Sequence, residues 1–126
     1  MAWLKVYEWE RSKWPEFQAV LVERKRQCAL VTKLARHFRV DRPLIKQSHK
    51  RGAGAVAGFG AAGSYHKSSY WPTIKLGQVT TLGTLVHEFA HHLAWRRWKE
   101  TGHGRAFKRE LKRTYTWAKR WLPKAA

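Results

Sequence analysis

Residues 87–91 carry the pattern H-E-x-x-H, which combines two metal-ligating side chains with a carboxylate. At about 100° of rotation per helical residue, His87 and His91 lie about 40° apart and one turn from each other, so both imidazoles project from one face. This spacing lets two ring nitrogens reach one zinc ion at roughly 2.0–2.1 Å. Glu88 lies beside that face, where a carboxylate can deprotonate a metal-bound water without becoming a ligand. The pattern predicts a hydrolytic Zn²⁺ site with Glu88 as general base.

A catalytic zinc ion has three protein ligands and one open position for water, so a third ligand is needed. His103 follows His91 by twelve residues, and the glycines on both sides of it permit a tight chain reversal back onto the first two ligands. Glu100 and Glu110 are alternative third ligands, and we favour His103. The remaining histidines are expected to serve the fold or the surface, with an oxyanion-binding role left open for three residues: Tyr65, His66 and Tyr70.

The ligands need a helix that is buried on one side. Residues Leu82–Trp98 have this pattern, because an apolar stripe lies opposite the two histidines of the motif and consists of Leu82, Val86, Phe89 and Leu93. Gly102-His103-Gly104 separates this helix from a last helix, expected over about Arg105–Trp121 and stopped by Pro123.

The N-terminal half supplies the remaining expected elements. Apolar residues recur at helical spacing over Trp14–Phe38, which predicts an N-terminal helix. Short strands are expected at Leu44–His49, near Ala55–Tyr65 in the glycine-rich segment, and at Trp71–Gly77, where Pro72 favours an edge position. The order of helix, two or three strands, helix and helix indicates an α+β fold, with residues 1–126 forming a single domain.

Composition points to a folded intracellular domain. Hydrophobic residues make up 44% of the 126 residues and include eight Trp, too many for a disordered basic tail. Cys28 is the only cysteine, which excludes an internal disulfide and a four-cysteine zinc ribbon, so any metal must bind His and carboxylates. We see neither a signal peptide nor an apolar run of membrane-spanning length, and we expect a cytoplasmic or nucleoid-associated protein without a membrane partner.

The charge is strongly basic, with 26 Lys+Arg against 8 Asp+Glu and a formal net charge of +18. Residues 52–86 carry only Lys67 and Lys75, so the excess lies in the flanking blocks and mainly on the first and last expected helices. Self-repulsion at this charge favours a polyanionic partner such as DNA, bound non-specifically through these basic helices. We interpret Trp117 and Trp121 as core residues rather than as platforms for stacked bases.

Two runs around the predicted ligands resemble a known family. Leu85-Val86-His87-Glu88-Phe89-Ala90-His91-His92-Leu93, followed by Gly102-His103-Gly104-Arg105-Ala106-Phe107-Lys108, is similar to the SprT-like branch of the zincin metallopeptidases. The resemblance implies zinc ligands at His87, His91 and His103, a general base at Glu88, and a minigluzincin-like core with a small three-stranded sheet. It also implies that Thr73–Gly77 is the edge strand along the cleft.

The same resemblance separates this chain from related metalloproteins. Spartan-type members cut proteins crosslinked to DNA and carry separate DNA-binding parts, whereas this chain lacks their cysteine-rich zinc ribbon. In the motif of the rRNA-maturation metalloproteins, the third histidine would fall at position 97, where this chain has Arg97. The expected function is therefore a zinc metallopeptidase that hydrolyses proteins or peptides, including DNA-associated ones, with the substrate paired to Ile74–Leu76. The alternative is a non-catalytic basic nucleic-acid-binding module with a structural metal.

Overall fold

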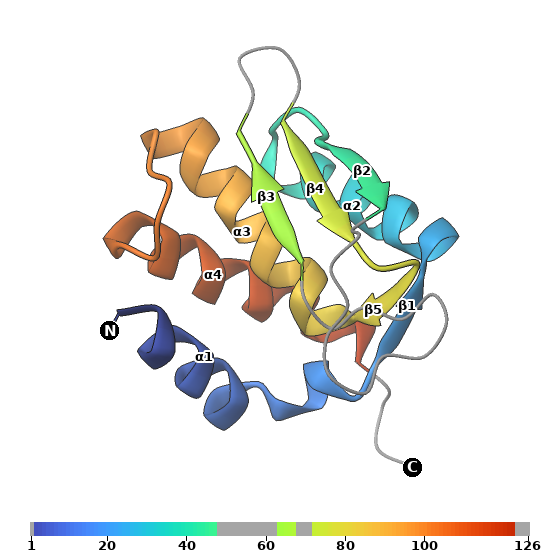
Figure 1. Cartoon of the computed structure of the whole chain (residues 1–126), viewed down its shortest axis with the longest axis horizontal. Coiled ribbons are helices and arrows are strands. Elements are labelled where there is room, and N and C mark those ends of the chain that lie inside the picture. The colour runs from blue at the N-terminus through green and yellow to red at the C-terminus, as the bar shows by residue number, and fades with distance from the viewer. Residues whose placement is uncertain (1, 48–62, 68–71, 123–126) are drawn as a thin grey trace.

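The computed structural model describes residues 2–47, 63–67 and 72–122, and the side chains from residue 6 onward (Figure 1). Its helices are α1 (Ala2–Lys13), α2 (Arg24–Phe38), α3 (Leu82–Trp98) and α4 (Arg105–Ala118), with short 3-10 helices η1 (Pro15–Gln18) and η2 (Lys119–Trp121). Helices and small sheets combine in one chain, so the expected α+β class is confirmed. Among the described residues, none of the helices has the length and apolar character needed to cross a membrane.

Two small sheets accompany the helices. The three-stranded sheet has the order β2 (Leu44–Gln47), β4 (Thr73–Leu76), β3 (Ser64–His66), in which β4 runs parallel to β2 and antiparallel to β3. The second sheet pairs β1 (Leu21–Glu23) antiparallel with β5 (Val79–Thr81). Of the predicted strands, 48–49 and 55–62 lie outside the described residues.

The predicted edge position of the strand at residues 71–77 is wrong. β4 is the central strand, and its backbone pairs with a strand on each side. Pro72 does not prevent this, because it precedes the first residue of the strand and contributes its carbonyl oxygen, which accepts from the Leu44 amide at 2.9 Å. A proline just before a strand removes no hydrogen bond from the ladder.

The predicted single helix over Trp14–Phe38 is also wrong in its first half. The structure has η1 and β1 there, and α2 begins only at Arg24. Phe17 of η1 is fully buried, whereas Leu21 of β1, four residues later, is 58% exposed. Their four-residue spacing imitates a helical stripe, although the two residues lie in separate elements and only Phe17 belongs to the core. A further helix, α1, precedes this region and was not predicted.

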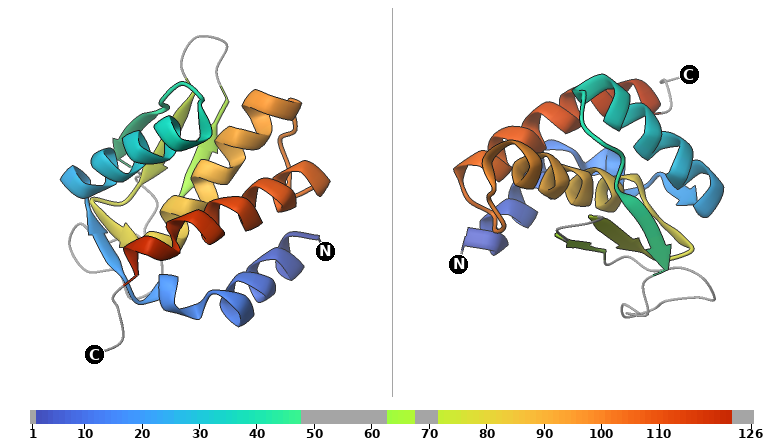
Figure 2. Two further views of the ribbon diagram at one scale, coloured as in Figure 1. Left: turned by 180° about the vertical axis from the view of Figure 1, so that it is seen from behind. Right: turned by 90° about the horizontal axis from the view of Figure 1, so that it is seen from above.

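α3 matches its predicted bounds and lies at the centre of the molecule. Thr81 caps its N-terminus by accepting a hydrogen bond from the Thr84 amide at 3.1 Å, and Lys99 ends it in the left-handed conformation with φ 56°. The predicted apolar stripe is fully buried. Figure 2 shows α3 between the three-stranded sheet on one side and α2 and α4 on the other. The buried surface of α3 therefore includes His87 and Glu88 as well as the apolar stripe on the opposite side of the helix.

The last helix is slightly shorter than expected. α4 ends at Ala118 and continues as η2 to Trp121, while Pro123 lies outside the described residues. Trp117 and Trp121 are partly buried and pack against the core, which supports their interpretation as core residues.

Candidate metal centre

The three histidines predicted as ligands come together at one point. α3 places His87 and His91 one turn apart, and the loop between α3 and α4 returns His103 to them. The Nε2 atom of His103 lies 3.2 Å from Nε2 of His87 and 3.1 Å from Nε2 of His91. Among the described residues, these three form a cluster whose candidate ligand atoms all lie within 4.8 Å of one another.

The spacing of these nitrogens fits a small metal ion. In a tetrahedral site with Zn–N distances of 2.0–2.1 Å, ligand nitrogens are about 3.3–3.4 Å apart, close to the two separations above. Three imidazole nitrogens are suitable ligands for Zn²⁺, and also for copper, iron and nickel. The three histidines therefore could hold a metal ion, and their chemistry alone does not select zinc.

The loop that carries His103 is anchored by Glu100. The Glu100 carboxylate accepts hydrogen bonds from the backbone amides of Phe107 at 2.8 Å and Ala106 at 3.3 Å, at the start of α4. A side chain at Gly104 would place its Cβ only 2.8 Å from Glu100 Oε1, so it would displace the carboxylate from these amides. No such contact exists at Gly102. Glu100 thus caps α4, which disfavours it as the third ligand.

Glu110, the other alternative ligand, is fully buried in a different cluster. Its carboxylate pairs with Arg97 at 2.9 Å and with Arg113 at 3.2 Å. These ion pairs join the end of α3 to α4, and Glu110 does not belong to the histidine cluster. Its role is in the fold.

Glu88 lines the same pocket as the three histidines. The pocket has a volume of about 480 Å³ and is also lined by Tyr7, Tyr65 and Trp95. The backbone at Gly63 passes close by, since a Cβ there would lie 3.0 Å from Cγ of Glu88. Burial raises the pKa of Glu88 to about 7, although the charge of His87 opposes the shift. A carboxyl group whose pKa lies near neutrality can both accept and return a proton.

The electrostatics of the cluster favour neutral imidazoles at two of the three positions. Burial, together with the charges of His87 and His103, lowers the pKa of His91 to about 3. Burial and the charge of His87 also lower the pKa of His103. At His87 burial acts in the same direction, but the hydrogen bond that His87 donates to Glu10 and the charge of Glu88 outweigh it and raise the pKa. Neutral imidazole is the form that binds a metal.

Two residues at this site were not predicted, and both come from α1. Glu10 Oε1 accepts a hydrogen bond from Nδ1 of His87 at 2.7 Å. The Tyr7 ring stacks on His87 with centroids 5.2 Å apart and meets His103 edge-on at 5.9 Å. The available signal was weak: Val6, Glu10 and Trp14 recur at four-residue spacing, and all three are buried. That burial is known from the structure alone, so the four-residue spacing was only a weak indication that Glu10 has buried partners.

His92, which was expected to serve the fold or the surface, has a hydrogen-bonding role inside the fold. It is fully buried, and its Nε2 donates to the backbone carbonyl of Asp41 at 2.7 Å. Burial lowers the pKa of His92, so the ring is neutral and its Nδ1 accepts from the Tyr65 hydroxyl at 2.8 Å. The Tyr65 proton is thereby directed to His92, which disfavours Tyr65 as an oxyanion donor. His66 lies on β3 and Tyr70 lies outside the described residues.

Comparisons of the chain with models of protein families, with curated protein sequences and with solved structures found no match.

Proposed function

We propose that this chain is a zinc-dependent metallopeptidase with a SprT-like arrangement of ligands. The observation that supports it is the convergence of the three histidine Nε2 atoms, with the Glu88 carboxylate lining the same pocket. A structural zinc site needs no carboxylate beside its ligands, whereas a hydrolytic site needs a base there. The combination favours hydrolysis over the alternative of a purely structural metal.

The proposed reaction assigns each residue a separate task. His87, His91 and His103 would hold the zinc ion. When bound, zinc lowers the pKa of a coordinated water and polarises the scissile carbonyl. Glu88 accepts the proton of the attacking water and passes it to the amine that leaves, so one group serves as base and then as acid.

The position of the substrate differs from the one expected at Ile74–Leu76. Both edges of β4 are occupied by neighbouring strands, so a peptide cannot add to it. β3 lies at the edge of the described sheet, and its residues Ser64 and Tyr65 line the pocket of the histidines. An extended peptide that added to β3 would run along this pocket, with backbone hydrogen bonds to the strand.

Metal removal tests the proposal. Purified protein should contain one zinc ion per chain and cleave an unfolded protein substrate, with or without added DNA. Chelation should abolish cleavage, because the attacking water would lose its activation, and added Zn²⁺ should restore it. Metal content by mass spectrometry and cleavage by gel electrophoresis measure the two effects. Stoichiometric zinc without cleavage, in the presence and absence of DNA, would favour the structural-metal alternative.

A second proposed property is binding of nucleic acid by the surface between α2 and α4. His37 stacks on Trp117 with centroids 4.4 Å apart, and the Arg120 guanidinium lies over the same Trp117 ring at 4.3 Å. Lys112 and Arg113 line the shallow pocket at this place, which has a volume of about 490 Å³. Cations gathered in one hollow are suited to phosphates, and the Trp117 ring holds the Arg120 guanidinium there.

Salt dependence tests this surface. Binding of single-stranded DNA should weaken as salt increases, because neutralised phosphates release counterions. Replacing both Lys112 and Arg120 by Ala should reduce the slope of log K against log salt by roughly one per lost phosphate contact. The matched control replaces Arg42 and Lys46, which are exposed near and on β2, and should change the slope little. Equal slopes for both double variants, in fluorescence anisotropy titrations, would remove the assignment to this surface.

A further inference from the structure

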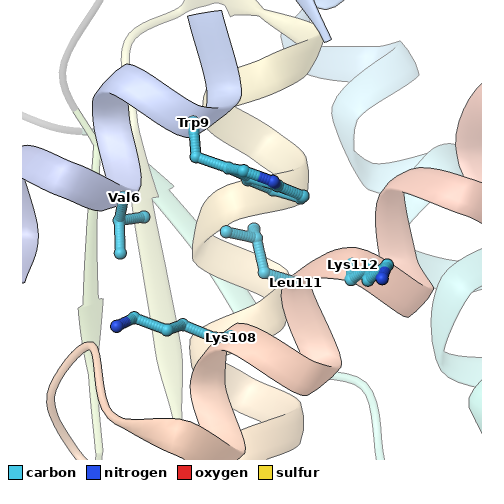
Figure 3. Close-up of a pocket in the computed structure, with 5 residues that line it drawn as sticks. All are labelled: Val6, Trp9, Lys108, Leu111 and Lys112. Carbon is cyan, nitrogen blue, oxygen red and sulfur yellow. The ribbon is translucent and has the colours of Figure 1, made fainter. Parts of the chain in front are cut away.

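α1 packs against α4 next to the metal centre although it is at the opposite end of the chain. Figure 3 shows Val6 and Trp9 of α1 facing Leu111 of α4, with Lys108 and Lys112 on the same helix. Val6 is only 3% exposed. These five residues line a pocket of about 300 Å³ between the helices. The next buried position along α1 is Glu10.

Glu10 is a carboxylate with almost no access to water. It is 3% exposed, and both of its oxygens have buried partners. Oε1 accepts from Nδ1 of His87 at 2.7 Å, and Oε2 accepts from the hydroxyl of Tyr115. A buried carboxylate is costly unless each oxygen is hydrogen-bonded. Both oxygens of Glu10 meet that condition, and Oε1 places the negative charge of the carboxylate beside the His87 imidazole.

Tyr115 is itself fixed in place. It is fully buried, stacks on Trp14 with centroids 5.5 Å apart, and meets Phe17 edge-on at 4.7 Å. Its hydroxyl therefore has little freedom to follow a movement of Glu10. The pair forms a rigid support that reaches the metal centre through Nδ1 of His87.

The two nitrogens of His87 face in opposite directions. Nε2 points to the other histidines, and Nδ1 points to Glu10. A proton on Nδ1 that is donated to a carboxylate fixes the tautomer, leaves the Nε2 lone pair for the metal and makes that nitrogen more basic. Tyr7, three residues earlier on α1, stacks on the same ring within 10° of parallel. α1 thus fixes the His87 ring in two ways: Glu10 accepts a hydrogen bond at the ring edge, and Tyr7 stacks on the ring face.

We propose that Glu10 is the positioning residue of the metal centre, acting through His87 and supported by Tyr115. This inference rests on the proposed function, since it assumes that the three histidines bind zinc. It extends that function by assigning part of the zinc affinity to α1, a helix that supplies none of the three histidines.

Zinc affinity of a series of variants tests the inference. Glu10→Ala should weaken zinc binding about 10- to 100-fold, as loss of such a partner does in other zinc sites. Glu10→Gln keeps an oxygen acceptor without the charge and should show a smaller loss, and Tyr115→Phe should show a loss of a few-fold. Competition with a chromophoric chelator measures affinity. NMR of the imidazole Nδ1–H of His87 reports the hydrogen bond directly, and its resonance should shift in Glu10→Gln.

The matched control is Glu110→Gln, which alters a carboxylate that is equally buried but has arginine partners. It should lower the thermal stability of the metal-free protein and leave zinc affinity unchanged. Wild-type affinity in Glu10→Ala and Glu10→Gln, or equal losses in Glu10→Gln and Glu110→Gln, would overturn the inference while leaving the peptidase proposal intact. Wild-type protein that binds no zinc would overturn both. Zinc binding that depends on Glu10, in a protein without cleavage activity, would support the inference and contradict the peptidase proposal alone.

Discussion

Glu88→Gln is expected to abolish peptide hydrolysis while leaving the metal content unchanged. The amide has nearly the size and shape of the carboxylate, so the pocket lined by Glu88 should retain its form. It cannot take a proton from the attacking water, and loss of a positioned base costs about 10²- to 10⁴-fold in rate. Turnover of a quenched fluorescent peptide, measured beside zinc content, tests this expectation.

The control for this variant is Glu110→Gln, which also removes one buried negative charge. Glu110 lies outside the histidine cluster, so this variant should retain activity under conditions where it is folded. Activity of Glu88→Gln within tenfold of wild type would contradict the assignment of Glu88 as the base. Loss of zinc from the same variant would show that Glu88 contributes to binding.

Local patterns predicted the elements that local interactions determine. α3 was predicted with its observed bounds because its apolar stripe and its ligand spacing both lie within Leu82–Trp98. The strands depend on distant partners instead. β4 is central because β2 and β3 pair with it from both sides, and a four-residue strand carries no trace of that pairing. The three-residue strand β1 is likewise too short to show alternation, and its Leu21 was assigned to a helical stripe.

The site shows the same division between local and distant contacts. His87, Glu88 and His91 lie within five residues, and His103 follows on the next loop, so spacing could identify them. Glu10 is separated from His87 by 77 positions, and nothing in the chain near either residue indicates the other. Its burial is a tertiary property. A single acidic residue on an unpredicted helix has the appearance of an ordinary solvated side chain until the packing of α1 on α4 is known.

His103→Ala is expected to weaken zinc binding about 10²- to 10³-fold. Structural zinc sites gain about 10–16 kcal/mol from four ligands, which is roughly 2.5–4 kcal/mol for each, and 1.4 kcal/mol corresponds to a factor of ten. His103 lies on a loop and is only partly buried, so its removal should not impair folding. Equilibrium competition with a chelator measures the affinity, and circular dichroism confirms the fold.

His66→Ala is the matched control, because His66 is an exposed histidine on β3 that lies outside the cluster. It should bind zinc with the affinity of the wild type. Unchanged stoichiometry and affinity in His103→Ala would mean that another group completes the site. Glu100, which lines the same pocket, would then be the first residue to test, and the capping of α4 would have to be compatible with a ligand role. A loss of affinity in His103→Ala with retention in His66→Ala would instead assign the third position to His103.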